Sequence, residues 1–430
     1  MTLGVTALTS SACTSTEVPL GAPNVGATSG TGAAAATGSP STPVSTTSDP
    51  KTEAHDAVAA LFAQRAAAMV AKDKGAWLGS LADTGSPFAA AQASLFDRLV
   101  GMPVSGLTAR QLSLTDAAAA DTVVANVKLG YRFTGYDQGD RSFAASYLVS
   151  RTSAGWRLVG PGPGPTNVQP FDLDGATTLS TPGTLVIGDV PLATLQAYQA
   201  LGEAARGPIG QAWGQARPAV IVAPASGAEL EAQLGRGSVA GLDQVAAITD
   251  GPLPSGEPAQ SDRVYLNPDA MGRLSTDGRR VVITHELTHV TVRGSTTRRV
   301  PIWLSEGYAD EVAFADSALP PKTVAADLLA LVRDGAGPST LPTASDFDPA
   351  KGTIAPMYSA AWLAVQLIRD QHGAGRLTDF YRAVSGGPTP DPAVTAAPDE
   401  LTRQAFTSVL GVSQDAFVAD WTAYLTRLAA

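Results

Sequence analysis

The sequence predicts an α+β protein in which an N-terminal domain of helices and an antiparallel meander precedes a domain with a mixed sheet and a mostly helical C-terminal half. Helical spacing of apolar residues begins near residue 53 and gives way to alternating apolar and polar segments between residues 107 and 159. From residue 184, strand-like segments alternate with helical ones, and beyond residue 266 the pattern is helical almost to the C-terminus. This order predicts layered domains, and a length of 430 residues suggests two to three of them.

The composition excludes several classes of protein. Lys and Arg number 29 against 39 Asp and Glu, so the net charge is -10, and a chain this acidic lacks the clustered cations that bind nucleic acid. Hydrophobic residues make up 44%, enough for packed cores, but no run approaches the about 18 apolar residues of a membrane-spanning helix. Because Cys13 is the only cysteine, an internal disulfide framework and a multi-cysteine metal site are excluded.

The first 50 residues predict a leader and a tether. Residues 1–13 end in a run of small residues at Cys13, and residues 14–50 consist mainly of Ser, Thr, Gly, Ala and Pro, which predicts a disordered segment. This arrangement resembles the end of a bacterial lipoprotein signal, here truncated, with no basic segment and with Ser10 where such signals usually carry Leu. The resemblance implies lipidation of Cys13 and an extracytoplasmic protein, either membrane-anchored through that lipid or secreted. The alternative is an incidental cysteine in a disordered leader.

Residues 51–165 predict a cone-shaped domain of helices and a meander. Apolar spacing indicates helices over 57–70 and 89–99. Alternating segments then predict strands at 107–114, 122–133, 142–151 and 156–159. This element order resembles the nuclear-transport-factor-2-like, cystatin-like superfamily, which contains both enzymes and inert modules. The segment contains neither paired carboxylates nor a histidine cluster, so a spacer or binding module is expected.

The run Gly-Pro-Gly-Pro-Gly-Pro at 160–165 predicts the boundary before a second domain over 180–430. The elements predicted there are strand 184–190, helix 191–206, strand 219–223, helix 228–234, strands 244–249 and 263–266, and helices thereafter.

The motif His285-Glu286-Leu-Thr-His289 points to metal chemistry. On a helix, two histidines four residues apart lie one turn apart on one face and can bind one ion, whereas on a strand they would be about 13 Å apart. Most of the neighbouring residues are β-branched, and their propensity favours a strand. We expect a helix nevertheless, because packing rather than intrinsic propensity determines a fully buried helix.

A second motif, Pro301-Ile-Trp-Leu-Ser-Glu306-Gly-Tyr-Ala-Asp310, begins 12 residues after His289. A helix that opens near Pro301 would place Glu306 and Asp310 one turn apart on the same side. A carboxylate from this helix would complete a set of two histidines and one glutamate, which leaves a fourth position open for water, as catalytic zinc sites do.

Together the two motifs are similar to those of the gluzincin metallopeptidases, the Peptidase MA-like domains, and the resemblance covers about residues 180–430. It implies that His285, His289 and Glu306 bind Zn²⁺. It implies that Glu286 is the general base that takes a proton from a zinc-bound water. Asp310 would accept the other ring N–H of His285 and fix its tautomer.

The resemblance also implies a tyrosine that donates to the developing oxyanion. Tyr358 is the best match, and Tyr308 is its rival, although in this motif the position of Tyr308 usually holds an aromatic packing residue. The segment 263–267 is expected to be the edge strand that pairs with the substrate backbone. No Gly-x-Met-x-Asn segment, which grips the amino terminus of substrates in aminopeptidases, precedes His285, so an endopeptidase is favoured.

Structural alternatives stay open for each of these residues. The histidines could be a satisfied buried pair, Glu306 an ordinary helix glutamate, and Asp310 a surface acid. Tyr358 could equally be a core aromatic, and His372, which precedes Gly373, is expected in the last turn of a helix and is not assigned to the metal.

The sequence therefore predicts a secreted or lipid-anchored zinc endopeptidase that acts on a peptide or protein, with no nucleic-acid partner and with membrane contact only through Cys13. Two alternatives are a surface-binding or scaffold lipoprotein with a peptidase-like fold and no turnover, and a purely structural metal site, which would need a fourth protein ligand. The sequence does not indicate an oligomeric state.

Overall fold

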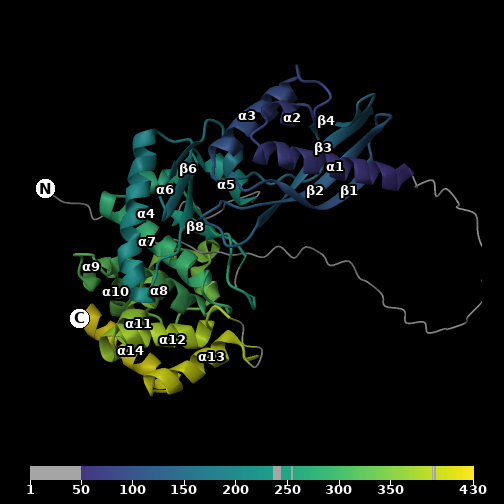
Figure 1. Ribbon diagram of the computed structural model, residues 1–430. Helices are drawn as coiled ribbons and strands as arrows, with labels where there is room; N and C mark the ends of the chain where they lie inside the picture. Colours follow the sequence, from purple (N-terminus) through teal and green to yellow (C-terminus); the bar gives the residue numbers. More distant parts are fainter. Residues whose placement is uncertain (1–49, 236–243, 253–254, 390, 392–393) are drawn as a thin grey trace, which may run out of the picture.

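The computed structural model describes residues 50–235, 244–252, 255–389, 391 and 394–430 (Figure 1). Cys13, the predicted leader and the predicted tether up to residue 49 lie outside the described residues. Within the described part the fold is α+β, as the sequence predicts, with a four-stranded antiparallel sheet and a five-stranded mixed sheet. None of the described helices is both long and apolar enough to span a bilayer.

The N-terminal domain packs helices against an antiparallel meander. Its elements are α1 (Pro50–Val70), α2 (Lys74–Leu78), α3 (Pro87–Gly101), β1 (Thr108–Asp116), β2 (Thr122–Tyr131), β3 (Arg141–Thr152) and β4 (Gly155–Pro161). The four strands pair in sequence order, and α1 packs across β1 and β4. The structure thus contains both predicted helices and all four predicted strands. The short helix α2 was not predicted, because five residues are too few to show a helical period.

The segment predicted as a domain boundary, 160–165, lies against β3. The backbone N–H of Gly162 donates to the carbonyl of Ser146, and that of Gly164 donates to the Ser146 hydroxyl. A Cβ added to Gly164 would lie 2.1 Å from the side-chain oxygen of Asn126. Close approach to the meander therefore requires a glycine at this position.

The second sheet is mixed and runs in the order β5-β6-β7-β9-β8. Its strands are β5 (Thr177–Ser180), β6 (Thr184–Gly188), β7 (Ala219–Ala223), β8 (Ala247–Asp250) and β9 (Arg263–Leu266). Strands β6, β7 and β9 are parallel, whereas β5 and β8 are antiparallel to their neighbours. The prediction that the segment 263–267 is the edge strand is wrong, because β9 inserts between β7 and β8 and leaves β8 at the edge.

Helices form most of the chain after β6. They are α4 (Leu192–Trp213), α5 (Gly227–Leu234), α6 (Pro268–Arg273), α7 (Thr276–Arg293), α8 (Ile302–Phe314), α9 (Pro321–Val324), α10 (Ala326–Arg333), α11 (Ala355–His372), α12 (Ala374–Ser385), α13 (Pro398–Ala405) and α14 (Gln414–Ala429). Single helical turns of 3-10 or π type lie at Pro170–Asp172, Ala344–Phe347, Pro349–Lys351 and Phe406–Leu410.

The two faces of the mixed sheet pack against different parts of the chain. Ile187 and Tyr265 belong to a core that they share with the helices and meander of the N-terminal domain. Val186 and Val264, whose side chains point the other way, belong to the core formed with the C-terminal helices. In Figure 1 the N-terminal domain and the helical half accordingly lie on opposite sides of this sheet.

Helix α7, which carries the His-Glu-x-x-His motif, is a helix despite its many β-branched residues. Ser275 caps it by accepting from the N–H of Gly278, and every residue from Val281 to Arg293 is buried against α4, α8 and the sheet. The hydroxyls of Thr284 and Thr288 donate to carbonyls four residues earlier, which satisfies them inside the core. Packing therefore outweighs propensity, as expected.

Candidate metal centre

Helix α7 brings the two motif histidines together. The Nε2 atoms of His285 and His289 lie 3.0 Å apart, and both side chains are buried. One helical turn separates the residues, so the rings project from the same face of α7. This is the arrangement that two ligands of one ion require.

Helix α8 brings Glu306 to the same point. Its Oε2 lies 3.3 Å from Nε2 of His285, and its Oε1 lies 3.6 Å from Nε2 of His289. The next residue, Gly307, allows α8 to pack closely on α11, because a Cβ there would lie 2.4 Å from the carbonyl oxygen of Ala361. A glycine at 307 thus helps to set the depth at which Glu306 meets the histidines.

Asp310 lies one turn after Glu306 and contacts the opposite side of the His285 ring. Its Oδ1 is 2.7 Å from Nδ1 of His285. Burial raises the pKa of Asp310, and the adjacent His285 opposes that rise. A proton on Nδ1 that is donated to this carboxylate leaves Nε2 as the lone-pair nitrogen, which faces His289 and Glu306.

Glu286 follows His285 on α7 and is fully buried. The hydroxyl of Thr249, on edge strand β8, donates to its Oε2 at 2.5 Å. Thr249 was not predicted as a site residue, and no local pattern in the sequence marks it. Its place beside Glu286 depends on β8 lying at the sheet edge, which the sequence order of the strands does not reveal.

His289 has a further polar contact that was not predicted from the sequence. The hydroxyl of Ser305 is 3.5 Å from Nδ1 of His289, and Tyr381 of α12 bonds with Ser305. Burial raises the pKa of the Tyr381 hydroxyl. Ser305 could have been predicted as a neighbour of the site, because it directly precedes the predicted ligand Glu306 in the first turns of α8.

The charge balance of the cluster favours a bound cation. Burial raises the pKa of Glu306, but His289 and His285, when protonated, lower it to about 2 through their charge and their hydrogen bonds. Oε2 of Glu306 is buried 3.3 Å from Nε2 of His285. A buried, ionised carboxylate is costly unless a cation meets it.

The donor set fits zinc. One ligand atom from each of His285, His289 and Glu306 lies within 4.8 Å of the others, and within the described residues no other cluster meets this criterion. Imidazole nitrogens and a carboxylate oxygen are ligands that Zn²⁺ prefers, and three protein ligands are typical of catalytic sites. A structural site would need a fourth.

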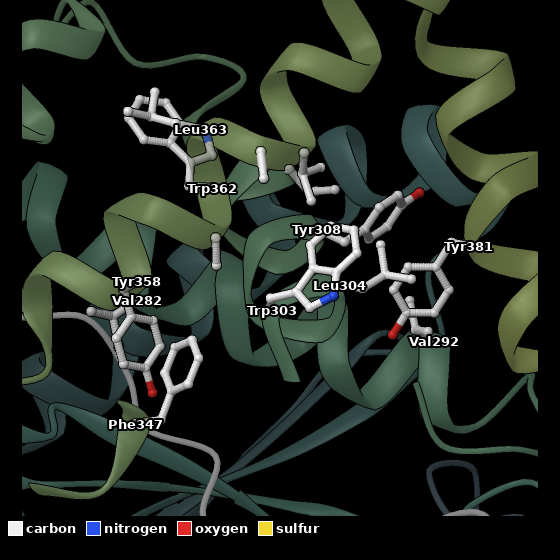
Figure 2. Packing of buried hydrophobic residues seen from close by; sticks show 14 of the residues in the cluster. Val282, Val292, Trp303, Leu304, Tyr308, Phe347, Tyr358, Trp362, Leu363 and Tyr381 are labelled. Atoms are coloured by element: carbon white, nitrogen blue, oxygen red, sulfur yellow. The ribbon is translucent and has the colours of Figure 1, made fainter. Parts of the chain in front are cut away.

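The two candidate tyrosines have different surroundings in the structure. The hydroxyl of Tyr308 lies 3.2 Å from the carbonyl of Ala212 and from the hydroxyl of Thr378, which supports the packing interpretation. Tyr358, at the start of α11, is buried with its ring edge-on to Phe347 (Figure 2). Its role as oxyanion donor stays a prediction.

The remaining histidines lie outside this cluster. His372 is the last residue of α11, followed by Gly373 at a φ of 87°, as expected for a helix that ends at glycine. His55 is exposed on α1.

Comparison with known proteins gives remote likenesses. No protein-family model matches the chain, and no curated protein sequence is similar to it. Among solved structures, it is similar to an M1 zinc metallopeptidase variant from Deinococcus radiodurans, at 14% identity and a TM-score of 0.30 over 74% of this chain and 61% of that one. The structure of the same variant with a bound Tyr-Ser-Ala substrate is similar at 15% identity and a TM-score of 0.32, again over 74% of this chain and 61% of that one.

Yeast LTA4 hydrolase is similar at 12% identity and a TM-score of 0.36, over 75% of this chain and 59% of that one. The matched region therefore spans about three fifths of these proteins. Likenesses at such TM-scores do not identify a function, which must be argued from the histidines and carboxylates themselves.

Proposed function

We propose that the chain is a zinc-dependent endopeptidase. The observation that carries this proposal is the convergence of His285, His289 and Glu306, with Glu286 buried beside the first ligand. A set of three protein ligands together with an adjacent carboxylate is the arrangement that metal-assisted hydrolysis needs.

The roles of the residues follow from their positions. Zn²⁺ held by the two Nε2 atoms and the Glu306 carboxylate would polarise the substrate carbonyl and make a water acidic. The Thr249 hydroxyl holds Oε2 of Glu286, so that its carboxylate is oriented to accept a proton from the attacking water and return it to the leaving amine. Asp310 keeps the proton of His285 on Nδ1.

We infer that the substrate backbone pairs with edge strand β8. Asn267 donates to the carbonyl of Ala246, so alternation along an antiparallel pair directs the backbone groups of Ala247 and Thr249 away from β9. Both of these residues are buried there, and the Thr249 carbonyl accepts from Arg293. An extended peptide that adds to this edge would lie beside Glu286. The proposal extends to an extracytoplasmic location, either secreted or anchored through a lipid on Cys13.

Peptide hydrolysis with a matched variant tests this proposal. The full chain, stripped of metal and then supplied with Zn²⁺, is incubated with an unfolded protein, and the products are identified by mass spectrometry. We expect internal cleavages, and we expect Glu286→Gln to bind zinc normally but to lower kcat by about 10²- to 10⁴-fold. Zinc-loaded protein that binds peptides at the same affinity with and without Glu286 and never cleaves them would favour the surface-binding alternative.

A further inference from the structure

Two arginine–aspartate pairs join the N-terminal domain to the last two strands of the mixed sheet. At the first, the guanidinium of Arg141, the first residue of β3, donates to the Asp250 carboxylate at 2.5 Å. A second nitrogen of Arg141 lies 3.4 Å from the carbonyl of Asp250 and 3.3 Å from that of Ser261. Arg141 therefore holds the end of β8 through both side chain and backbone.

The second pair is fully buried. Arg263, the first residue of β9, binds both carboxylate oxygens of Asp137, at 2.6 and 2.7 Å. Asp137 also accepts from the backbone N–H of Phe133, and the Arg263 guanidinium lies 4.8 Å from the centre of the Phe133 ring. Because both charges are removed from water, this bidentate contact depends strictly on its geometry.

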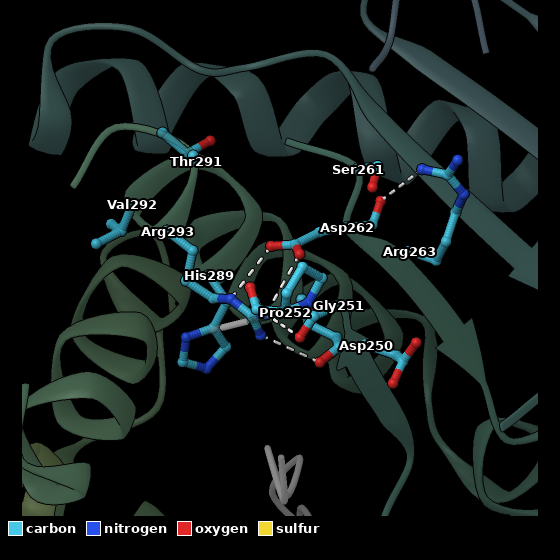
Figure 3. Close-up of polar contacts among 12 residues, drawn as sticks. Asp250, Gly251, Pro252, Ser261, Asp262, Arg263, His289, Thr291, Val292 and Arg293 are labelled. Atoms are coloured by element: carbon cyan, nitrogen blue, oxygen red, sulfur yellow. Dashed lines mark hydrogen bonds and ion pairs between the residues drawn. The ribbon is translucent and has the colours of Figure 1, made fainter. Parts of the chain in front are cut away.

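A third arginine connects the end of β8 to α7, the helix that carries His285 and His289. Arg293, one turn after His289, donates to the carbonyl of Gly251 at 2.8 Å and to that of Thr249 at 3.3 Å. It also contacts the Asp262 carboxylate, with each of two nitrogens 3.2 Å from an oxygen. In Figure 3 its side chain lies between Asp262 and the backbone of Gly251 and Pro252.

The Arg141 contact lies at Asp250, one residue after Thr249, whose hydroxyl donates to the Glu286 carboxylate. A displacement of Asp250, which accepts from Arg141, would therefore also move Thr249 relative to Glu286. Strand β8 pairs with β9 over only four residues, Ala247–Asp250, so this short ladder alone is a weak restraint on an edge strand. The N-terminal domain supplies an additional restraint from outside the catalytic domain.

We propose that Arg141 is a positioning residue for the active site, and that the N-terminal domain thereby fixes the strand on which substrate pairs. The expected change in KM rests on the proposed peptidase function, whereas the expected change in the order of β8 does not. Without the Arg141 contact, the end of β8 separates more readily from the N-terminal domain. The substrate-pairing edge then becomes less ordered while the metal ligands stay in place.

The test compares two arginine variants of the full chain. Arg141→Met removes the contact with Asp250. Arg132→Met is the matched control, because Arg132 pairs with Asp140, the residue next to Arg141, within the N-terminal domain. Asp250→Asn weakens the same contact from the β8 side, and it replaces Arg141→Met in the test if that variant does not fold.

The first readout is hydrogen exchange in residues 245–250, which needs no substrate. We expect Arg141→Met and Asp250→Asn to exchange on the order of tenfold faster there than the parent, whereas Arg132→Met does not. Zinc content should be equal in all four proteins. Unchanged exchange in Arg141→Met, or an equal rise in Arg132→Met, would overturn the proposal.

The second readout is the split between KM and kcat. KM for peptide cleavage should rise on the order of tenfold in Arg141→Met, with a smaller change in kcat, and should stay at the parent value in Arg132→Met. A fall in kcat alone would overturn the assignment to substrate pairing. If the parent protein cleaves nothing, the peptidase proposal fails, and the exchange result still decides the positioning claim.

Discussion

The mixed sheet separates two buried clusters of charged groups that differ in charge balance. On the side of the N-terminal domain, Arg263 and Asp137 match one cation with one anion through two hydrogen bonds. On the side of α7, His285, His289 and Glu306 direct acceptor atoms at a common point. The charges of the first cluster balance each other, whereas the second would be balanced by the proposed cation. Burial of charge by itself therefore does not mark a functional site; convergence of acceptors does.

The largest effect is expected from breaking the balanced pair. Asp137→Ala removes the carboxylate that Arg263 binds twice and should lower the free energy of unfolding by about 3–5 kcal/mol. Urea denaturation followed by tryptophan fluorescence measures this loss. Replacing both residues, as Asp137→Leu with Arg263→Met, should cost less than the single change. A single change that costs under about 1 kcal/mol would contradict the account of a tightly coupled buried pair.

A smaller effect is expected from weakening the support of the metal cluster. Asp310→Asn removes the negative charge at Nδ1 of His285 and should lower zinc affinity by about 10- to 100-fold, without loss of folding. Competition with a chromophoric chelator measures the affinity. Asp370→Asn, at a half-exposed carboxylate paired with Arg369, is the control and should leave zinc affinity unchanged. Equal affinities in the parent and in Asp310→Asn would show that Asp310 does not support the ligand.

The smallest effect is expected from a partly buried carboxyl group in the N-terminal domain. Burial raises the pKa of Asp172 from 3.8 to about 6, against a hydrogen bond from the N–H of Gln169 and the charge of Arg98. The native state therefore holds this proton more tightly than the unfolded state, so the contribution of Asp172 to stability declines as the pH rises from about 4 to about 6.

Asp172→Asn should remove this decline, which we put at about 1–2 kcal/mol after allowing for the partial exposure of the residue. Urea denaturation at pH 4 and at pH 7.5 gives the difference for each protein. Asp174→Asn, at a fully exposed carboxylate, is the control and should keep the pH dependence of the parent. An identical pH dependence in Asp172→Asn would refute the assignment.

Local sequence patterns predicted the elements that depend on short-range spacing. The i, i+4 spacing of His285 and His289 places both on one face of α7, and the second motif places Glu306 and Asp310 one turn apart on α8. The helices and meander before residue 165 follow from periodicity in the same way. These features could be predicted because each is fixed within a few residues of the chain.

Features that depend on long-range order could not be predicted. The insertion of β9 between β7 and β8 moves the edge to β8 and places Thr249 beside Glu286. Helix α4, expected to end at residue 206, continues through Pro208 to Trp213, whose ring packs against Tyr308 of α8. Tertiary packing there outweighs the local signal of Gly207-Pro208 to end the helix.

The contrast between the two clusters is tested most directly by metal content. Zinc is measured by mass spectrometry in the full chain and in His289→Ala, with circular dichroism to confirm that both are folded. We predict one zinc per chain in the parent and none in the variant, because two remaining ligands do not hold the ion. Folded parent protein without zinc, or zinc retained in His289→Ala, would contradict the assignment of His285, His289 and Glu306 as a metal site.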